Sequence, residues 1–262
     1  MRMCSIASGS SGNCIYVGSD NTHLLVDTGI SKKRIEEGLH ELEIKGEELD
    51  GILVTHEHSD HIQGLGVFCR KYEIPVYATA GTIRGIEECH SLGKMPAGLL
   101  HPIEVDKPFP LGEIEVHPFA VSHDANEPCG YRLESNRRAV AVATDLGMYD
   151  NYIVNHLQNL DAVLLEANHD LKMLQDGKYP VWLKQRILSN NGHLSNDATA
   201  RIANRLCEGS EVQRLLLGHI SENNNTEKIA YDTVENTLKE RDSDIELYVA
   251  HQNRRSEVFE IL

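Results

Sequence analysis

The stretch Val54-Thr-His-Glu-His-Ser-Asp-His-Ile62 places four potential metal-binding side chains within six residues. The apolar run 51–55 is typical of a buried strand, and apolar residues at helical spacing follow, so the four side chains lie on a strand-to-helix turn. Three of them alternate and can point to one side of this turn: His56, His58 and Asp60. His61 points the other way, which fits two adjacent metal ions better than one tetrahedral zinc. The alternative is a polar loop with exposed histidines.

The composition is that of a globular chain of 262 residues, long enough to bury a sizeable core. No apolar run approaches the roughly 20 residues that span a bilayer, so we expect no membrane association. The N-terminus lacks a secretory signal, which predicts a cytoplasmic protein. The six cysteines are scattered and contain no C-x-x-C motif, which favours reduced thiols over disulfides. The sequence does not predict an oligomeric state.

The formal net charge of −15 argues against a protein that coats nucleic acid through a basic face. It does not exclude a nuclease, because bound divalent cations add positive charge where a phosphate must lie.

Strand-like and helix-like segments alternate along the chain without a linker or repeat, which predicts one α/β domain over residues 1–262. Candidate ligands recur where predicted strands end, and such ends converge on the ligand-binding edge of α/β sheets. Besides the cluster at 56–61, these residues are Asp27, His123, Asp145 and His219.

The order of these residues resembles the metallo-β-lactamase fold over nearly the whole chain. The resemblance implies a four-layer αβ/βα sandwich of two mixed β-sheets with the metal site at one sheet edge. It also implies two divalent metal ions, bridged by Asp145, with Asp27 as a buried carboxylate that orients the ligands. One ion would be held by His56, His58 and His123, and the other by Asp60, His61 and His219.

The imidazole at His58 discriminates within this superfamily, because members with di-iron redox chemistry tend to carry Glu there. The resemblance therefore favours zinc or manganese over iron.

The C-terminal third is similar to ribonuclease Z and its relatives, in Gly192-His-Leu-Ser195 followed by a helix and Leu217-Gly-His-Ile-Ser221. His193 takes the place of a histidine that contacts or protonates the phosphate in that family. The segments Ser8-Gly-Ser-Ser-Gly-Asn13 and Glu166-Ala-Asn-His-Asp170 look like the YycJ/WalJ branch of bacterial proteins. Relatives of that branch are described as 5′ exonucleases, so the resemblance implies nucleic acid as substrate and favours DNA over RNA.

The expected reaction is hydrolysis of a phosphodiester by a hydroxide that bridges the two ions. The residues expected to be catalytic are His193, as a proton donor, and the metal ligand Asp60. A purely structural role beside the helix cap Ser195 is the alternative for His193. Four further residues are candidates for substrate contacts, with structural roles left open: Ser10, Ser11, Asn13 and His169.

Two other functions remain open. A small-molecule hydrolase, either a cyclic phosphodiesterase or a lactonase, would use the same metal centre and suits the acidic charge. A non-catalytic sensor of metal or nucleotide would also use this fold, but a filled set of metal positions argues against it.

Overall fold

The computed structural model describes residues 1–208 and 211–261. Its strands form two mixed sheets of seven strands each, as the resemblance implies. The chain divides into two compact units. The first contains Met1–Ala120, Ala125–Arg138 and His251–Leu262, and the second contains Val121–Asp124 and Ala139–Ala250. A single domain over residues 1–262 stays a prediction.

The first sheet lies wholly in the first unit and has the strand order β14-β1-β2-β3-β4-β5-β6. The strands from β14 to β3 pair antiparallel, and those from β3 to β6 pair parallel. Their bounds are β1 Arg2–Ala7, β2 Cys14–Gly18, β3 His23–Val26, β4 Gly51–Leu53, β5 Val76–Thr79, β6 Leu100–Ile103 and β14 Phe259–Glu260.

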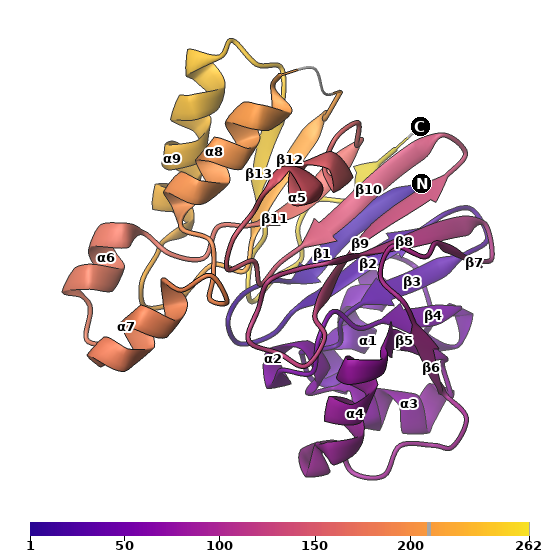
Figure 1. The fold of residues 1–262 in the computed structure, drawn as a ribbon. Coiled ribbons are helices and arrows are strands. Elements are labelled where there is room, and N and C mark those ends of the chain that lie inside the picture. Colours follow the sequence, from indigo (N-terminus) through magenta and orange to yellow (C-terminus); the bar gives the residue numbers. More distant parts are fainter. Residues whose placement is uncertain (209–210, 262) are drawn as a thin grey trace. The chain divides into compact units, whose positions relative to one another are not determined.

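Helices of the first unit cover one face of this sheet (Figure 1). Ser31 caps α1 by accepting a hydrogen bond from the Arg34 backbone N–H, as expected of a serine before an apolar periodic run. Ile35 and Leu39 then face the core, and burying each such side chain contributes about 1.5–3 kcal/mol. The helices are α1 Lys32–Glu41, α2 Ser59–Ile62, α3 Leu65–Tyr72 and α4 Ala80–Glu88, with 3-10 turns η1 Gly46–Glu48 and η2 His90–Leu92.

Three antiparallel strands of the second sheet also belong to the first unit. Tyr131 on β9 is fully buried, and its hydroxyl donates a hydrogen bond of 2.8 Å to the backbone oxygen of Val54. This bond joins β9 to the segment that leads from β4 into the histidine cluster. The strands are β7 Phe109–Leu111, β8 Ile114–Ala120 and β9 Cys129–Ser135.

The second unit contains the parallel part of the second sheet, whose order is β13-β12-β11-β10-β9-β8-β7. The run Leu215–Leu217 on β12 is fully buried, as is typical of a parallel strand covered on both faces. These strands are β10 Arg138–Ala143, β11 Ala162–Glu166, β12 Arg214–Gly218 and β13 Glu246–Val249.

The longer helices of the second unit pack against each other, and α9 also packs against β13 (Figure 1). Segment 171–192 contains two short helices. The helices are α5 Asn151–His156, α6 Leu171–Asp176, α7 Val181–Ile187, α8 Asn196–Leu206 and α9 Glu227–Glu240. Among the described residues, no helix has the length and apolar character needed to cross a bilayer.

Candidate metal centre

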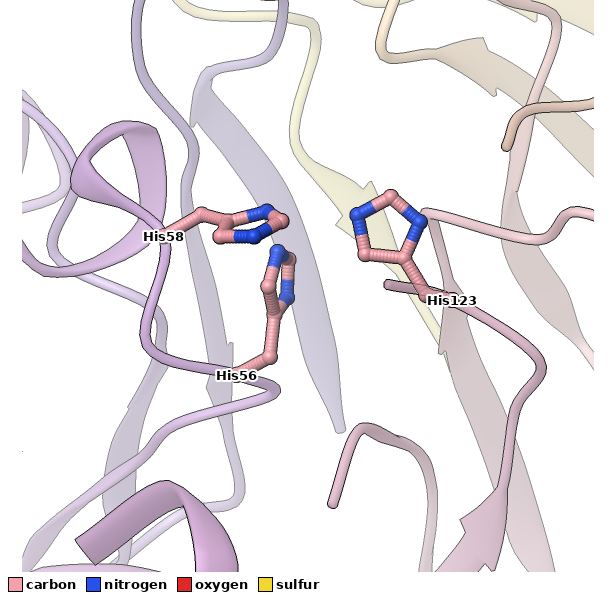
Figure 2. A group of neighbouring side chains, drawn as sticks. All are labelled: His56, His58 and His123. Atoms are coloured by element: carbon pink, nitrogen blue, oxygen red, sulfur yellow. The ribbon is translucent and has the colours of Figure 1, made fainter. Parts of the chain in front are cut away.

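The histidine cluster lies between β4 and α2, as the sequence predicts. His58 is the N-cap of α2, so Asp60 and His61 lie on the first turn of that helix. The ring of His56 lies 4.6 Å from that of His58 and 4.1 Å from that of His61, measured between ring centroids. Figure 2 shows His56 and His58 projecting side by side from this turn. The first unit alone therefore gathers three imidazoles within one short segment.

Asp27 is the buried carboxylate of this unit. One carboxylate oxygen accepts hydrogen bonds from the Thr55 hydroxyl, at 2.9 Å, and from the His61 ring Nδ1, at 2.7 Å. The other accepts from the Thr55 backbone N–H at 2.8 Å. A carboxylate on Nδ1 fixes the tautomer of an imidazole and leaves Nε2 as the ligand atom, which is the usual environment of a metal-binding histidine. The predicted orienting role of Asp27 fits this geometry.

The backbone beside the cluster is held by a close approach that requires glycine. A Cβ at Gly29 would lie 1.6 Å from the backbone oxygen of Asp60. The space allows Thr28 N–H to donate to the oxygen of His61 and Asn13 N–H to donate to the oxygen of Asp60, both at 2.8 Å. These bonds fix the turn that carries the candidate ligands.

The second unit gathers ligand-type atoms from four separate segments. One oxygen or ring nitrogen from each of four residues lies within 4.8 Å of the others, and the residues are Asp145, Glu166, His193 and His219. Glu166 ends β11 and is fully buried. Its Oε1 contacts Nδ1 of His193 at 2.8 Å and Nδ1 of His219 at 2.9 Å. Its Oε2 accepts from the backbone N–H groups of Leu146 and Leu194 at 2.9 and 3.0 Å.

This arrangement makes Glu166 a charged group despite its burial. Burial raises the pKa of Glu166, but the positive charge of His193 and the hydrogen bonds from both imidazoles outweigh it and lower the pKa below 4.5. Burial likewise lowers the pKa of His193, but the charge and hydrogen bond of Glu166 prevail and raise it above 6.5. His193 keeps 19 % of its side chain exposed, whereas Glu166 has none exposed. The histidine can therefore meet a substrate, and the carboxylate supports it.

His123 belongs to the second unit and is also drawn in Figure 2. Its Nδ1 lies 3.0 Å from the backbone oxygen of Gly192, so Nδ1–H donates and Nε2 remains the ligand atom. That Nε2 lies 3.6 Å from a carboxylate oxygen of Asp145. Burial lowers the pKa of His123 below 6.5, although the charge of Asp145 opposes this. The lowered pKa favours the neutral ring, which is the form that binds a metal.

Three residues of the predicted set have left-handed backbone conformations. The φ angles are 62° at Asp27, 59° at Asp145 and 52° at His219. Each follows the end of a strand, at a position where the chain turns sharply. Such a conformation costs a non-glycine residue about 1–3 kcal/mol and persists when surrounding contacts enforce it.

The four candidate residues for substrate contacts differ in how exposed they are. Ser10 and Ser11 are exposed, but Asn13 is buried. The Asn13 side chain bonds Gly9 and also contacts His61 Nε2 at 3.2 Å, so it joins loop 8–13 to the histidine cluster. His169 is buried, and within the described part of the chain neither ring nitrogen has a hydrogen-bond partner. Burial lowers the pKa of His169 to about 4, so its ring is neutral.

Sequence reasoning missed Glu166 and Thr55 as members of the site. The signal for Glu166 was present, because a carboxylate that ends a buried apolar strand must find partners. Thr55 carried no such signal, since a threonine is ordinary at the end of a strand.

The donor set suits a divalent metal of intermediate hardness. Imidazole nitrogens and carboxylate oxygens together favour zinc, manganese or iron over magnesium or calcium. In both units, imidazoles are held through Nδ1 by a carboxylate or a backbone oxygen, which is the outer support that metal-binding histidines usually have. The residues therefore fit a metal-dependent hydrolase.

Comparisons with known proteins agree with this chemistry. Residues 22–220 match the model of the beta-lactamase superfamily domain. The chain is 42 % identical to Exodeoxyribonuclease WalJ of Streptococcus pneumoniae and 41 % identical to Exodeoxyribonuclease YycJ of Bacillus anthracis. Each match covers 90 % of this chain and 88 % of the relative.

The fold is also that of a solved structure, the metallo-beta-lactamase fold protein YhfI from Bacillus subtilis. The TM-score is 0.72 at 17 % identity, over 99 % of each chain. The predicted fold class is confirmed. The chain therefore belongs to the beta-lactamase superfamily and, within it, to the family of the WalJ and YycJ exodeoxyribonucleases.

Proposed function

We propose that the chain is a dinuclear-metal-dependent phosphodiester hydrolase that acts as a 5′ exonuclease on DNA. The identity to WalJ and YycJ over 90 % of the chain supports a nuclease that acts on DNA. The 5′ polarity and the preference for DNA over RNA rest on the family resemblance.

The single observation that carries the chemistry is the pair of imidazoles on one buried carboxylate. His219 and His193 both direct Nδ1 to Glu166, so both leave Nε2 for another partner. In this arrangement Glu166 would hold both a metal ligand, His219, and a proton donor, His193. Hydrolysis of a phosphate ester at a metal centre needs both groups.

The ligand assignment follows the family pattern. One ion would be held by His56, His58 and His123, and the second by Asp60, His61 and His219. Asp145 would bridge the two ions, and zinc or manganese suits this nitrogen-rich set better than iron does. When bound, two such ions would lower the pKa of a water molecule to near 7 and offset negative charge on the phosphate.

His193 would act on the leaving group or on a phosphoryl oxygen. Glu166 raises the pKa of the His193 ring above 6.5, which favours the protonated form that a proton donor needs. With Nδ1–H donated to Glu166, the second ring proton lies on Nε2 and can pass to the leaving oxygen. Loss of such a general acid lowers a rate by about 10²–10⁴-fold.

The setting of the reaction remains a proposal as well. We infer that the protein works in the cytoplasm, because all six cysteines are free thiols, as is typical of a reducing compartment.

The deciding experiment compares wild type with Asp60→Asn on 5′-labelled single-stranded DNA, double-stranded DNA and RNA, with manganese or zinc. Short products from the wild type alone are expected and would establish the nuclease and its polarity. Hydrolysis of a small bis-aryl phosphate without cleavage of any strand would favour a cyclic phosphodiesterase, which the net charge of −15 also suits. Absence of both reactions would leave a lactonase or a non-catalytic sensor.

A further inference from the structure

A nuclease with a net charge of −15 needs local positive charge to hold a polyanion. Several of its cations are already neutralised by acids. The Arg132 guanidinium lies 2.6 Å from Glu134, and Arg186 pairs with Asp124. These two arginines therefore offer little net charge to a phosphate.

Three arginines of the first unit line one cavity of about 90 Å³. Arg34 comes from α1, and Arg254 and Arg255 come from the segment between β13 and β14. We call this group the arginine cavity. Its size suits one phosphate group.

Two acids also line the arginine cavity, but both have partners. Glu41 lies 2.6 Å from Arg255, and Glu37 lies 3.6 Å from Lys33. Arg34 donates a hydrogen bond to the backbone oxygen of Gln252, which fixes its guanidinium. Arg254 is exposed and has no ion-pair or hydrogen-bond partner among the residues that the structure describes. The cavity is therefore locally positive.

The arginine cavity is connected to the histidine cluster through loop 8–13. On the cavity side, Ser8 N–H donates to the oxygen of His251 at 3.0 Å, and a Cβ at Gly9 would lie 2.7 Å from the Gln252 side chain. On the other side, the Asn13 amide lies 3.2 Å from His61 Nε2. The exposed Ser10 and Ser11 lie between these contacts in the sequence. Only a few residues therefore separate the cavity from a candidate metal ligand within one unit.

We propose that the arginine cavity binds a backbone phosphate of the substrate strand beside the scissile one. Guanidinium groups bind phosphate through paired, charge-assisted hydrogen bonds, and they do so without reading the base. Such a contact positions a strand for stepwise cleavage whatever its sequence. This inference rests on the proposed nuclease function, and its test separates the two.

The test measures binding and cleavage of a single strand of about a dozen nucleotides. Two variants alter the cavity: Arg254→Ala, and a double variant that carries both Arg34→Ala and Arg254→Ala. Arg84→Ala is the matched control, because Arg84 is an exposed arginine on α4. Arg254→Ala removes a side chain without a partner, so it should fold normally. Binding is followed by fluorescence anisotropy of a labelled phosphorothioate strand, which resists hydrolysis.

The expected result is a loss that grows with strand length. The double variant should weaken binding and raise KM by about tenfold or more, since each lost charge-assisted hydrogen bond is worth about that factor. Its salt dependence should flatten by roughly 0.7 in the slope of log K against log salt, because the cavity contacts one phosphate of a single strand. The kcat for bis-aryl phosphate should not change, and Arg84→Ala should match the wild type.

Unchanged affinity and salt slope in the double variant, with DNA still cleaved, would overturn the inference and leave the nuclease intact. Equal affinity of the wild type for a mononucleotide and for the longer strand would also overturn it, by indicating a site for a free phosphate. Arginine-dependent binding of the strand without any cleavage would support the cavity and refute the nuclease.

Discussion

Each unit of the molecule contains one fully buried carboxylate that holds imidazoles through Nδ1, and the two differ in what they connect. Asp27 serves one imidazole, His61, and the neighbouring Thr55. Glu166 serves two imidazoles, His193 and His219, as well as two backbone N–H groups. Asp27 therefore positions one candidate ligand, whereas Glu166 links a candidate ligand to a candidate acid.

Asp27 and Glu166 are equally buried, yet we expect them to serve different functions. Asp27 must supply the hydrogen bond that keeps His61 in its tautomer. Glu166 must also carry charge, because the raised pKa of His193 depends on it. Three predictions test this distinction.

The largest effect is expected for Glu166→Gln. Loss of the negative charge should deprotonate His193 near neutral pH and lower kcat by about 10²–10⁴-fold, the size of a general-acid effect. Steady-state rates and metal content are measured for Glu166→Gln, for His193→Ala and for the double variant that carries both. The two losses should not add, because both remove the same acid. Additive losses would show that Glu166 acts apart from His193.

A smaller effect is expected for Asp27→Asn. The amide still occupies the site but holds the Nδ1–H of His61 less strongly, so metal affinity should fall by about 10–100-fold. Excess metal should restore most of the kcat of Asp27→Asn. It should not restore the kcat of Glu166→Gln. Titration with zinc or manganese measures both, with Asp20→Asn at an exposed aspartate as the matched control. If excess metal fails to restore kcat, the distinction between the two carboxylates fails.

The smallest effect concerns the pH dependence of thermal stability in the metal-free protein. Because its folded-state pKa lies below 4.5, Glu166 stabilises the fold above pH 4.5, and this is lost as pH falls toward the lowered value. Because its folded-state pKa lies above 6.5, His193 stabilises the fold below pH 6.5, and this is lost as pH rises through the raised value. Tm from the pair should therefore be highest between pH 4.5 and 6.5. Glu166→Gln should weaken the fall of Tm on both the acidic and the alkaline side. An unchanged profile of Tm against pH would show that other groups cause the dependence.

The candidate site residues of the first unit were easier to predict from sequence than those of the second unit. The candidate ligands at 56–61 lie within six residues, so their spacing alone predicted one strand-to-helix turn. The partners of Glu166 come from positions 146, 193, 194 and 219, and no local pattern pairs residues so far apart. The strand ends were predicted because apolar runs end where polar ligands begin. The short helices α6 and α7 were not, because their apolar residues Val181 and Trp182 are exposed and leave no periodic pattern.

The left-handed backbone at Asp27, Asp145 and His219 limits which amino acids these positions can hold. Glycine, asparagine, aspartate and histidine tolerate that conformation best, and β-branched residues tolerate it least. Two of the four tolerated types are metal ligands, so the backbone itself restricts variation toward residues that can bind a metal. For protein engineering, glycine is the cleanest way to disable these positions, because it removes the side chain and relieves the strain together. A glycine variant that loses metal yet has a higher Tm would show that the strained backbone at this position lowers stability and is needed only for metal binding.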